Sequence, residues 1–186
     1  GLFGVDMQLV QSDRAGETGR GGILDVRYAA SSAIQHKFEF EYFDSRVNVN
    51  DLGFLRRNNY RGGQYLLSYA YPKPGRWFQA TRGTLIFRHQ ENLTAGQVVD
   101  QGVFWRNTLV LKGRNTIRSA IAYLPSRYED RNSRGNGAYK TADRIWLNAL
   151  WATDASRSLS FSTSIGGLQE DLGDWTLSLT AGVTAR

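Results

Sequence analysis

The chain has 186 residues, of which 41% are hydrophobic, 12% are aromatic and none is cysteine. The absence of cysteine excludes a disulfide framework and thiolate chemistry. The formal net charge is +6, but the basic residues are scattered along the chain without forming a run, so we expect no nucleic-acid partner. No stretch approaches the roughly 18 apolar residues that a membrane-spanning helix needs.

Apolar and polar residues alternate along the whole chain, in segments of about ten residues. This period of two predicts β-strands with one apolar and one polar face, the first over residues 2–10 and the last over residues 175–185. In chain order, the apolar faces carry Phe3, Val5, Met7 and Leu9; Leu24, Val26 and Tyr28; Phe38, Phe40 and Tyr42; Tyr65, Leu67, Tyr69 and Tyr71; Leu85 and Phe87; Val103, Trp105, Leu109 and Leu111; Ile117, Ile121 and Tyr123; Ile145, Leu147 and Trp151; Leu159, Phe161, Thr163 and Ile165; and Trp175, Leu177, Leu179, Ala181 and Val183.

The connections between these strands are predicted to alternate between long and short. The long ones cover residues 11–21, 44–60, 89–97 and 125–140, and the short ones cover residues 30–33, 72–75, 112–115 and 154–157. Such alternation is typical of an up-and-down barrel in an outer membrane, with long exterior loops and short periplasmic turns.

Aromatic residues gather near the ends of the predicted strands. They would form the two interfacial girdles of a membrane barrel. Tyrosine and tryptophan are also favourable strand residues in any sheet, so a purely structural interpretation stays open. The residues in question are Tyr28, Tyr42, Tyr69, Tyr71, Trp77, Tyr123, Trp151 and Trp175.

The polar faces carry too many charges for a sandwich core, because each unpaired charge would cost several kcal/mol to bury. We expect these residues to line a water-filled lumen or the seat of a plug. The alternative is a soluble β-barrel or sandwich that binds an apolar ligand with its apolar face turned inward. The predicted lumen-lining residues are Arg27, Glu39, Glu41, Arg82, Arg88, Arg106, Arg118 and Arg144.

The longest predicted connection contains the segment NDLGFLRRNNY, which follows the aromatic strand FEFEY. This pair of segments resembles the barrel region of an uncharacterised bacterial outer-membrane family, in which a carbohydrate-binding-type β-sandwich domain precedes a C-terminal barrel. The resemblance implies an outer-membrane location and a barrel, but no catalytic residue. The segment is either an ordinary turn at Gly53 or a ligand-binding exterior loop, whose candidate residues are Asn50, Asp51, Arg56, Arg57, Asn58 and Asn59.

Catalytic motifs are weak in this sequence. The two histidines, His36 and His89, lie on different predicted strands, and no nucleophile elbow, metalloprotease motif or phosphate-binding loop occurs. An outer-membrane enzyme would have to build its site from these histidines with Glu39 and Glu41. We therefore expect no enzyme, no cofactor and no metal site.

The sequence predicts a single all-β region over residues 1–186, an antiparallel up-and-down transmembrane barrel of about ten strands. The chain begins and ends within predicted strands and lacks a terminal aromatic residue, so we expect part of a larger barrel. Pairing of residues 2–10 with residues 175–185 would instead indicate a small closed barrel. The expected role is a channel, transport or surface binding in the bacterial outer membrane, with membrane lipid and a small solute or carbohydrate as partners.

Overall fold

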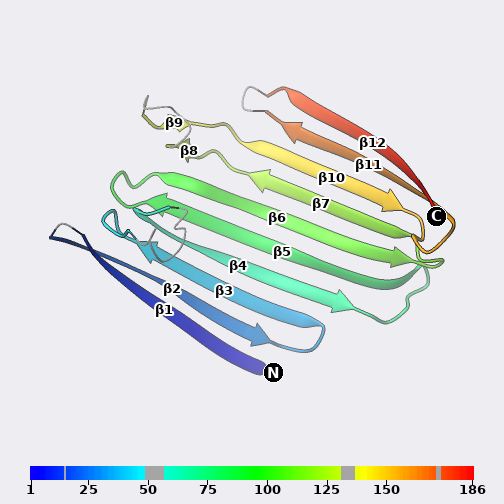
Figure 1. Cartoon of the computed structure of the whole chain (residues 1–186), viewed down its shortest axis with the longest axis horizontal. Coiled ribbons are helices and arrows are strands. Elements are labelled where there is room, and N and C mark those ends of the chain that lie inside the picture. The colour runs from blue at the N-terminus through cyan, green and yellow to red at the C-terminus, as the bar shows by residue number, and fades with distance from the viewer. Residues whose placement is uncertain (15, 49–56, 131–136, 171–172) are drawn as a thin grey trace.

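The computed structural model describes residues 1–14, 16–48, 57–130, 137–170 and 173–186. In this part of the chain, ten strands form one antiparallel sheet, in which each strand pairs with the next strand of that sheet along the chain (Figure 1). A two-stranded hairpin of β8 (Tyr128–Glu129) and β9 (Tyr139–Lys140) stands apart from it. The ten strands are β1 (Leu2–Arg14), β2 (Glu17–Ala29), β3 (Ile34–Phe43), β4 (Tyr60–Tyr71), β5 (Phe78–Asn92), β6 (Val98–Leu111), β7 (Thr116–Leu124), β10 (Arg144–Ala152), β11 (Leu159–Gln169) and β12 (Trp175–Ala185).

The connections fall at two opposite ends of the sheet. The loop end carries residues 15–16, 44–59, 93–97, 125–143 and 170–174, and lies at the left of Figure 1. The turn end carries residues 30–33, 72–77, 112–115 and 153–158, and both chain termini lie there. The described residues contain no helix long and apolar enough to cross a membrane.

The predicted alternation of connection lengths is wrong at two of the four long positions. Residues 11–21 are mostly paired strand, because Gln11 lies opposite Arg20 and Asp13 opposite Thr18. β5 likewise continues to Asn92, which leaves only residues 93–97 as a loop. The reason is that backbone pairing continues past the apolar part of a strand, so loss of apolar alternation does not mark the end of a strand. Among the connections between the described strands of the sheet, only 44–59 and 125–143 are long.

The predicted alternation of faces is confirmed by the register of the sheet. Residues directly opposite each other on antiparallel strands point to the same side. One continuous row across eight strands runs Val5, Val26, Phe38, Tyr65, Phe87, Val103, Tyr123 and Ile145. All ten predicted apolar sets therefore share one side of the sheet, which we call the apolar face, and the opposite side is the polar face.

On β3 and β10, exposure is inverted relative to a water-soluble sheet. On β3, Phe38 is 52% and Phe40 is 51% exposed, whereas the side chain of Glu39 between them is 18% exposed. β10 alternates in the same sense, since Ile145 and Leu147 are exposed and their polar-face neighbours are partly buried. On these two strands the polar face is thus the more enclosed side, whereas Arg82, Arg106 and Arg118 on the polar face of β5, β6 and β7 are exposed.

The sheet is open. β1 and β12 are its two edges and do not pair with each other among the described residues. The ten strands therefore do not form the small closed barrel that such pairing would have shown.

A small apolar core lies on the polar face at the loop end. Phe43 stacks on Tyr60 with ring centroids 5.6 Å apart, and Val47 packs beside them. Gly21 is required here, because a Cβ at this position would lie 2.3 Å from the Phe43 ring. This core fixes the first residues of the 44–59 loop over β2 and β3.

Candidate functional site

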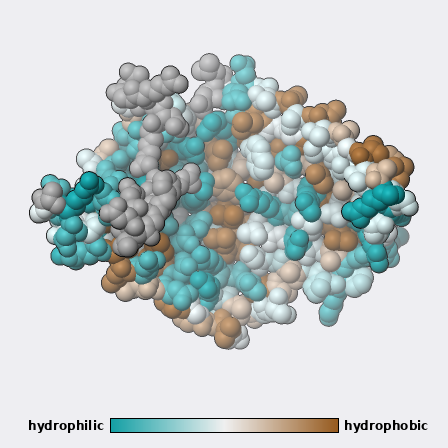
Figure 2. Space-filling view, in the orientation of Figure 1, coloured by the Kyte–Doolittle hydropathy of each residue, from teal (hydrophilic) through white to brown (hydrophobic). Residues whose placement is uncertain are grey.

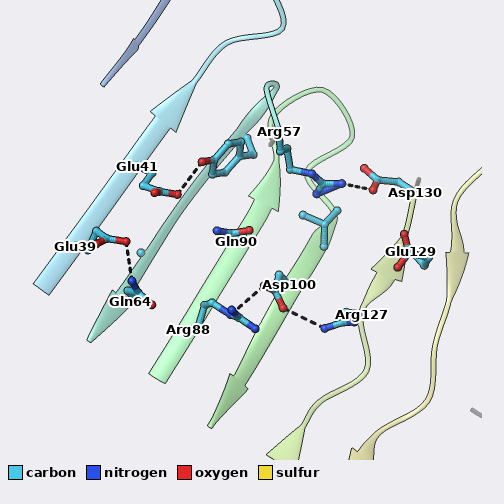
Figure 3. Close-up of a pocket in the computed structure, with 13 residues that line it drawn as sticks. Glu39, Glu41, Arg57, Gln64, Arg88, Gln90, Asp100, Arg127, Glu129 and Asp130 are labelled. Atoms are coloured by element: carbon cyan, nitrogen blue, oxygen red, sulfur yellow. Dashed lines mark hydrogen bonds and ion pairs between the residues drawn. The ribbon is translucent and has the colours of Figure 1, made fainter. Parts of the chain in front are cut away.

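A cleft of about 550 Å³ lies on the polar face at the loop end, and we call it the polar cleft (Figure 3). Strands β3 to β6 form its floor, while the end of the 44–59 loop and the β8 region close one side. Its lining residues are Glu39, Glu41, Arg57, Tyr60, Gly63, Gln64, Arg88, Gln90, Val99, Asp100, Arg127, Glu129 and Asp130.

Asp100 on β6 joins two arginines across the floor of the cleft. Its Oδ1 accepts a hydrogen bond of 3.0 Å from Arg127 Nη1, and its Oδ2 lies 2.9 Å from Arg88 Nε, in ion-pair contact. The Arg88 guanidinium also lies over the Phe104 ring, 5.0 Å from its centroid. Phe104 can lean this way because Gly102 has no side chain, and a Cβ there would lie 2.8 Å from the ring. Asp100 therefore orders both arginines of the floor.

The two glutamates of β3 are held by side chains of β4. The Tyr60 hydroxyl donates a hydrogen bond of 2.7 Å to Glu41 Oε2, and Gln64 Nε2 donates one of 2.6 Å to Glu39 Oε1. Glu39 Oε2 in addition accepts a hydrogen bond of 2.6 Å from Lys37 Nζ. Each carboxylate thus accepts at least one hydrogen bond in this partly enclosed site.

An ion pair links the two long connections above the cleft. Arg57 Nη2 binds Asp130 Oδ1, with both side chains largely buried. Asn92 Nδ2 donates a further hydrogen bond of 3.2 Å to Asp130 Oδ2. The rim of the cleft is therefore tied together by side chains from three separate segments.

The base of the 125–143 connection is fixed by Asp143. The Tyr123 hydroxyl donates a hydrogen bond of 2.6 Å to its Oδ2, and the Ser126 amide donates one of 2.7 Å to its Oδ1. These two donors, with the tyrosine first, hold the pKa of the Asp143 carboxyl below its ordinary value. The same anchor positions Arg127, which follows directly.

The cleft is lined by many hydrogen-bond donors and acceptors. Five carboxylates and three guanidiniums line it, and the Gln90 carboxamide forms no hydrogen bond with any residue that the structure describes. No group of three or more histidine, cysteine or acidic side chains suited to a metal ion occurs among the described residues.

All eight predicted lumen-lining residues lie on the polar face. Three of them, Glu39, Glu41 and Arg88, line the polar cleft. Arg27 pairs with Asp6 and Asp25 instead. Arg82 and Arg106 line a different cavity nearer the turn end, and Arg118 and Arg144 lie on the same face. Whether this face encloses a lumen stays a prediction.

The predicted loop ligand-binding set is divided by the structure. Asn50, Asp51 and Arg56 lie outside the described residues. Arg57 reaches the polar cleft. Asn58 and Asn59 have structural positions in the loop instead. Asn58 Nδ2 donates a hydrogen bond of 3.0 Å to the Ser45 carbonyl. Asn59 adopts a positive φ of 59° at the end of the loop.

The histidines do not join the acidic residues that an enzyme site would need. His36 and His89 lie on the apolar face, where they contact Tyr65 and Glu91, whereas Glu39 and Glu41 lie on the opposite face. Sequence reasoning missed Tyr60, Arg127 and Asp130 as cleft residues. Alternation on β4 could have placed Tyr60 on the polar face, but no pattern marks Arg127 or Asp130, which lie in an irregular connection.

No curated protein and no solved structure matches the chain significantly. One family model matches residues 4–182, which is nearly the whole chain, and it is described as a domain of unknown function, DUF5916. The chain, which folds into the open ten-stranded sheet with the polar cleft, therefore belongs to the DUF5916 family.

Proposed function

We propose that this chain forms part of the wall of a transmembrane β-barrel in a bacterial outer membrane. The observation that supports this most strongly is the inverted exposure on β3 and β10, where the aromatic and aliphatic side chains are exposed and their polar-face neighbours are partly buried. A barrel in lipid has this arrangement, with apolar side chains facing outward and polar ones inward.

The aromatic residues of the apolar face support the proposal. Tyr42, Tyr123 and Trp175 stand near the loop end, and Tyr28, Tyr69, Tyr71 and Trp151 stand near the turn end. On β4, position 61 lies opposite Tyr42, so residues 61–69 span the two levels. This is roughly 27 Å of strand, or roughly 21 Å along the membrane normal at a tilt near 40°, close to the apolar band of about 25 Å in such barrels.

The long open edges fit a larger barrel. β1 and β12 each present a row of unpaired backbone groups, which native proteins pair or cover. Further strands outside this chain would pair both edges and close the wall. The resemblance to outer-membrane proteins with an N-terminal carbohydrate-binding-type domain fits the same architecture.

The polar cleft would then face the interior, where a small hydroxylated solute such as a carbohydrate is the ligand that its groups suit. The carboxylate oxygens accept hydrogen bonds from hydroxyl groups, and the Gln90 carboxamide both accepts and donates them. The role proposed for the chain is therefore passage or binding of a polar solute, with no catalytic step.

Localisation of the full-length protein in a Gram-negative host tests this proposal. We expect it in the outer-membrane fraction, resistant to extraction by salt, with a gel mobility that changes on boiling. Recovery of folded protein in the soluble fraction, with unchanged mobility, would overturn the proposal.

A soluble module for an apolar ligand is the second candidate. One observation favours it: the apolar face has a depression of about 510 Å³ beside Gly63, lined by Phe38, Phe40 and Phe87 among others. Such a module would cover this face with a second layer of protein. Recovery in the soluble fraction is the outcome that would support it.

A further inference from the structure

Three arginines on neighbouring strands face the same space at the turn-end half of the polar face. Arg82 on β5 lies opposite Thr108 on β6, and Thr108 lies opposite Arg118 on β7. Arg106 is two residues from Thr108 and therefore diagonal to both of the other arginines, at about 7–8 Å in a sheet. Three like charges are thus held close together by the register alone.

All three arginines are exposed, and their guanidiniums have no partner in the part of the chain that the structure describes. No described residue forms an ion pair or hydrogen bond with Arg82, Arg106 or Arg118, in contrast to Arg57, Arg88 and Arg127 in the polar cleft. The two rows that contain them hold neutral residues otherwise. The first row runs Gln35, Ser68, Thr84, Arg106, Ala120, Asn148, Gly166 and Ser178. The second runs Ala70, Arg82, Thr108, Arg118, Leu150, Ser164 and Thr180.

A row of apolar residues separates these arginines from the polar cleft. It runs Leu66, Ile86, Phe104, Ala122, Trp146 and Leu168 across six strands of the polar face. Figure 2 shows a hydrophobic strip running across the strands between hydrophilic regions. On β5, Thr84 lies opposite Arg106, and Arg88 lies in the polar cleft. These two positions are four residues apart, or roughly 13 Å along the strand. That separation exceeds the Debye length of about 8 Å at physiological salt, so the cleft carboxylates do not neutralise the arginines.

A cavity of about 330 Å³ lies against two of the arginines. Its lining includes Arg82 and Arg106 with the hydroxyl groups of Ser68, Thr84 and Thr108. Guanidinium groups and hydroxyl donors are the groups that bind phosphate oxygens, the arginine through two parallel hydrogen bonds. The cavity also has room for a group larger than a single phosphate.

We infer that this cavity binds a phosphate-bearing anionic solute, with Arg82 and Arg106 as direct ligands and Arg118 adding to the positive potential. The binding relieves the repulsion among the three cations. The inference needs only the polar face as described, and it holds whether or not further strands close the sheet.

Calorimetric titration of the purified full-length protein with inorganic phosphate, and with glycerol phosphate in a second arm, tests the inference. We expect saturable binding of at least one of them, weakened at least tenfold by Arg106→Gln and further by the Arg82→Gln, Arg106→Gln double variant. Preference for inorganic phosphate would identify the free ion as the ligand, and preference for glycerol phosphate would identify a phosphate ester.

The matched control is Arg157→Gln, which removes one exposed charge from the turn 153–158 without touching the cavity. It is expected to leave the affinity within twofold. An absence of phosphate binding by the unaltered protein, or equal weakening by Arg157→Gln and Arg106→Gln, would overturn the inference. These outcomes are independent of the membrane localisation experiment, so the two proposals can fail separately.

Discussion

The Tyr60 hydroxyl donates a 2.7 Å hydrogen bond to Glu41 Oε2, while the same Tyr60 ring stacks on Phe43. One side chain therefore belongs both to the small apolar core and to the wall of the polar cleft. The 44–59 loop ends at Tyr60, so the contact ties the position of that loop to the charge of Glu41.

Tyr60→Phe is expected to separate these two roles. The ring packing is kept, but Glu41 loses its donor, which lowers the free energy of unfolding by about 1–2 kcal/mol. Tyr60→Leu removes the stacking as well and is expected to cost more. Urea unfolding of the full-length protein gives both values, and a Tyr60→Phe variant as stable as the unaltered protein would contradict the assigned role.

Asp100→Asn is expected to destabilise the cleft, because Arg88 and Arg127 share that carboxylate. The three side chains are partly buried, so we expect a loss of about 1–2 kcal/mol. Asp6→Asn is the matched control, since the Asp6–Arg27 pair is exposed and should change stability by less than about 0.5 kcal/mol. Equal unfolding midpoints for the two variants would show that Asp100 does not organise the cleft.

Gly102→Val is expected to displace the Phe104 ring and with it the Arg88 guanidinium. The added side chain would occupy the space that the ring fills, and such overpacking costs about 1–3 kcal/mol. Gly4→Ala serves as control, because a Cβ there meets nothing within 4 Å. Thermal unfolding compares the two, and unchanged stability of Gly102→Val would mean that Phe104 does not need the open space.

Protonation of Asp143 is expected to loosen the 125–143 connection. Its pKa is lowered in the folded state, mainly by the Tyr123 hydroxyl. The stabilising contribution is therefore present above the unfolded-state pKa of about 3.9 and is lost as the pH falls through the lower folded value. A carboxyl-carbon NMR titration should give a midpoint below 3.9, shifted upward in Tyr123→Phe. A midpoint at the ordinary aspartate value in both proteins would refute this.

The faces of the strands could be predicted from sequence because side-chain direction follows a period of two regardless of tertiary structure. Phe38, Glu39 and Phe40 illustrate this, since their alternation survives unchanged in the sheet. Strand ends could not be predicted in the same way: Gln11 and Asp13 pair although their side chains carry no apolar pattern. The sites depend on register, because Arg57, Asp100 and Asp130 come from three segments whose alignment no local pattern specifies.

The proposed direction of the two faces is tested most directly on β10. Single cysteines at Leu147 and Asn148 are adjacent in sequence but lie on opposite faces, and this chain has no cysteine of its own. The full-length protein, labelled with a fluorophore at either site, is reconstituted in bilayers that contain brominated lipid. We expect strong quenching at position 147 and little at position 148. Equal quenching at both positions, or stronger quenching at 148, would contradict a lipid-facing apolar face.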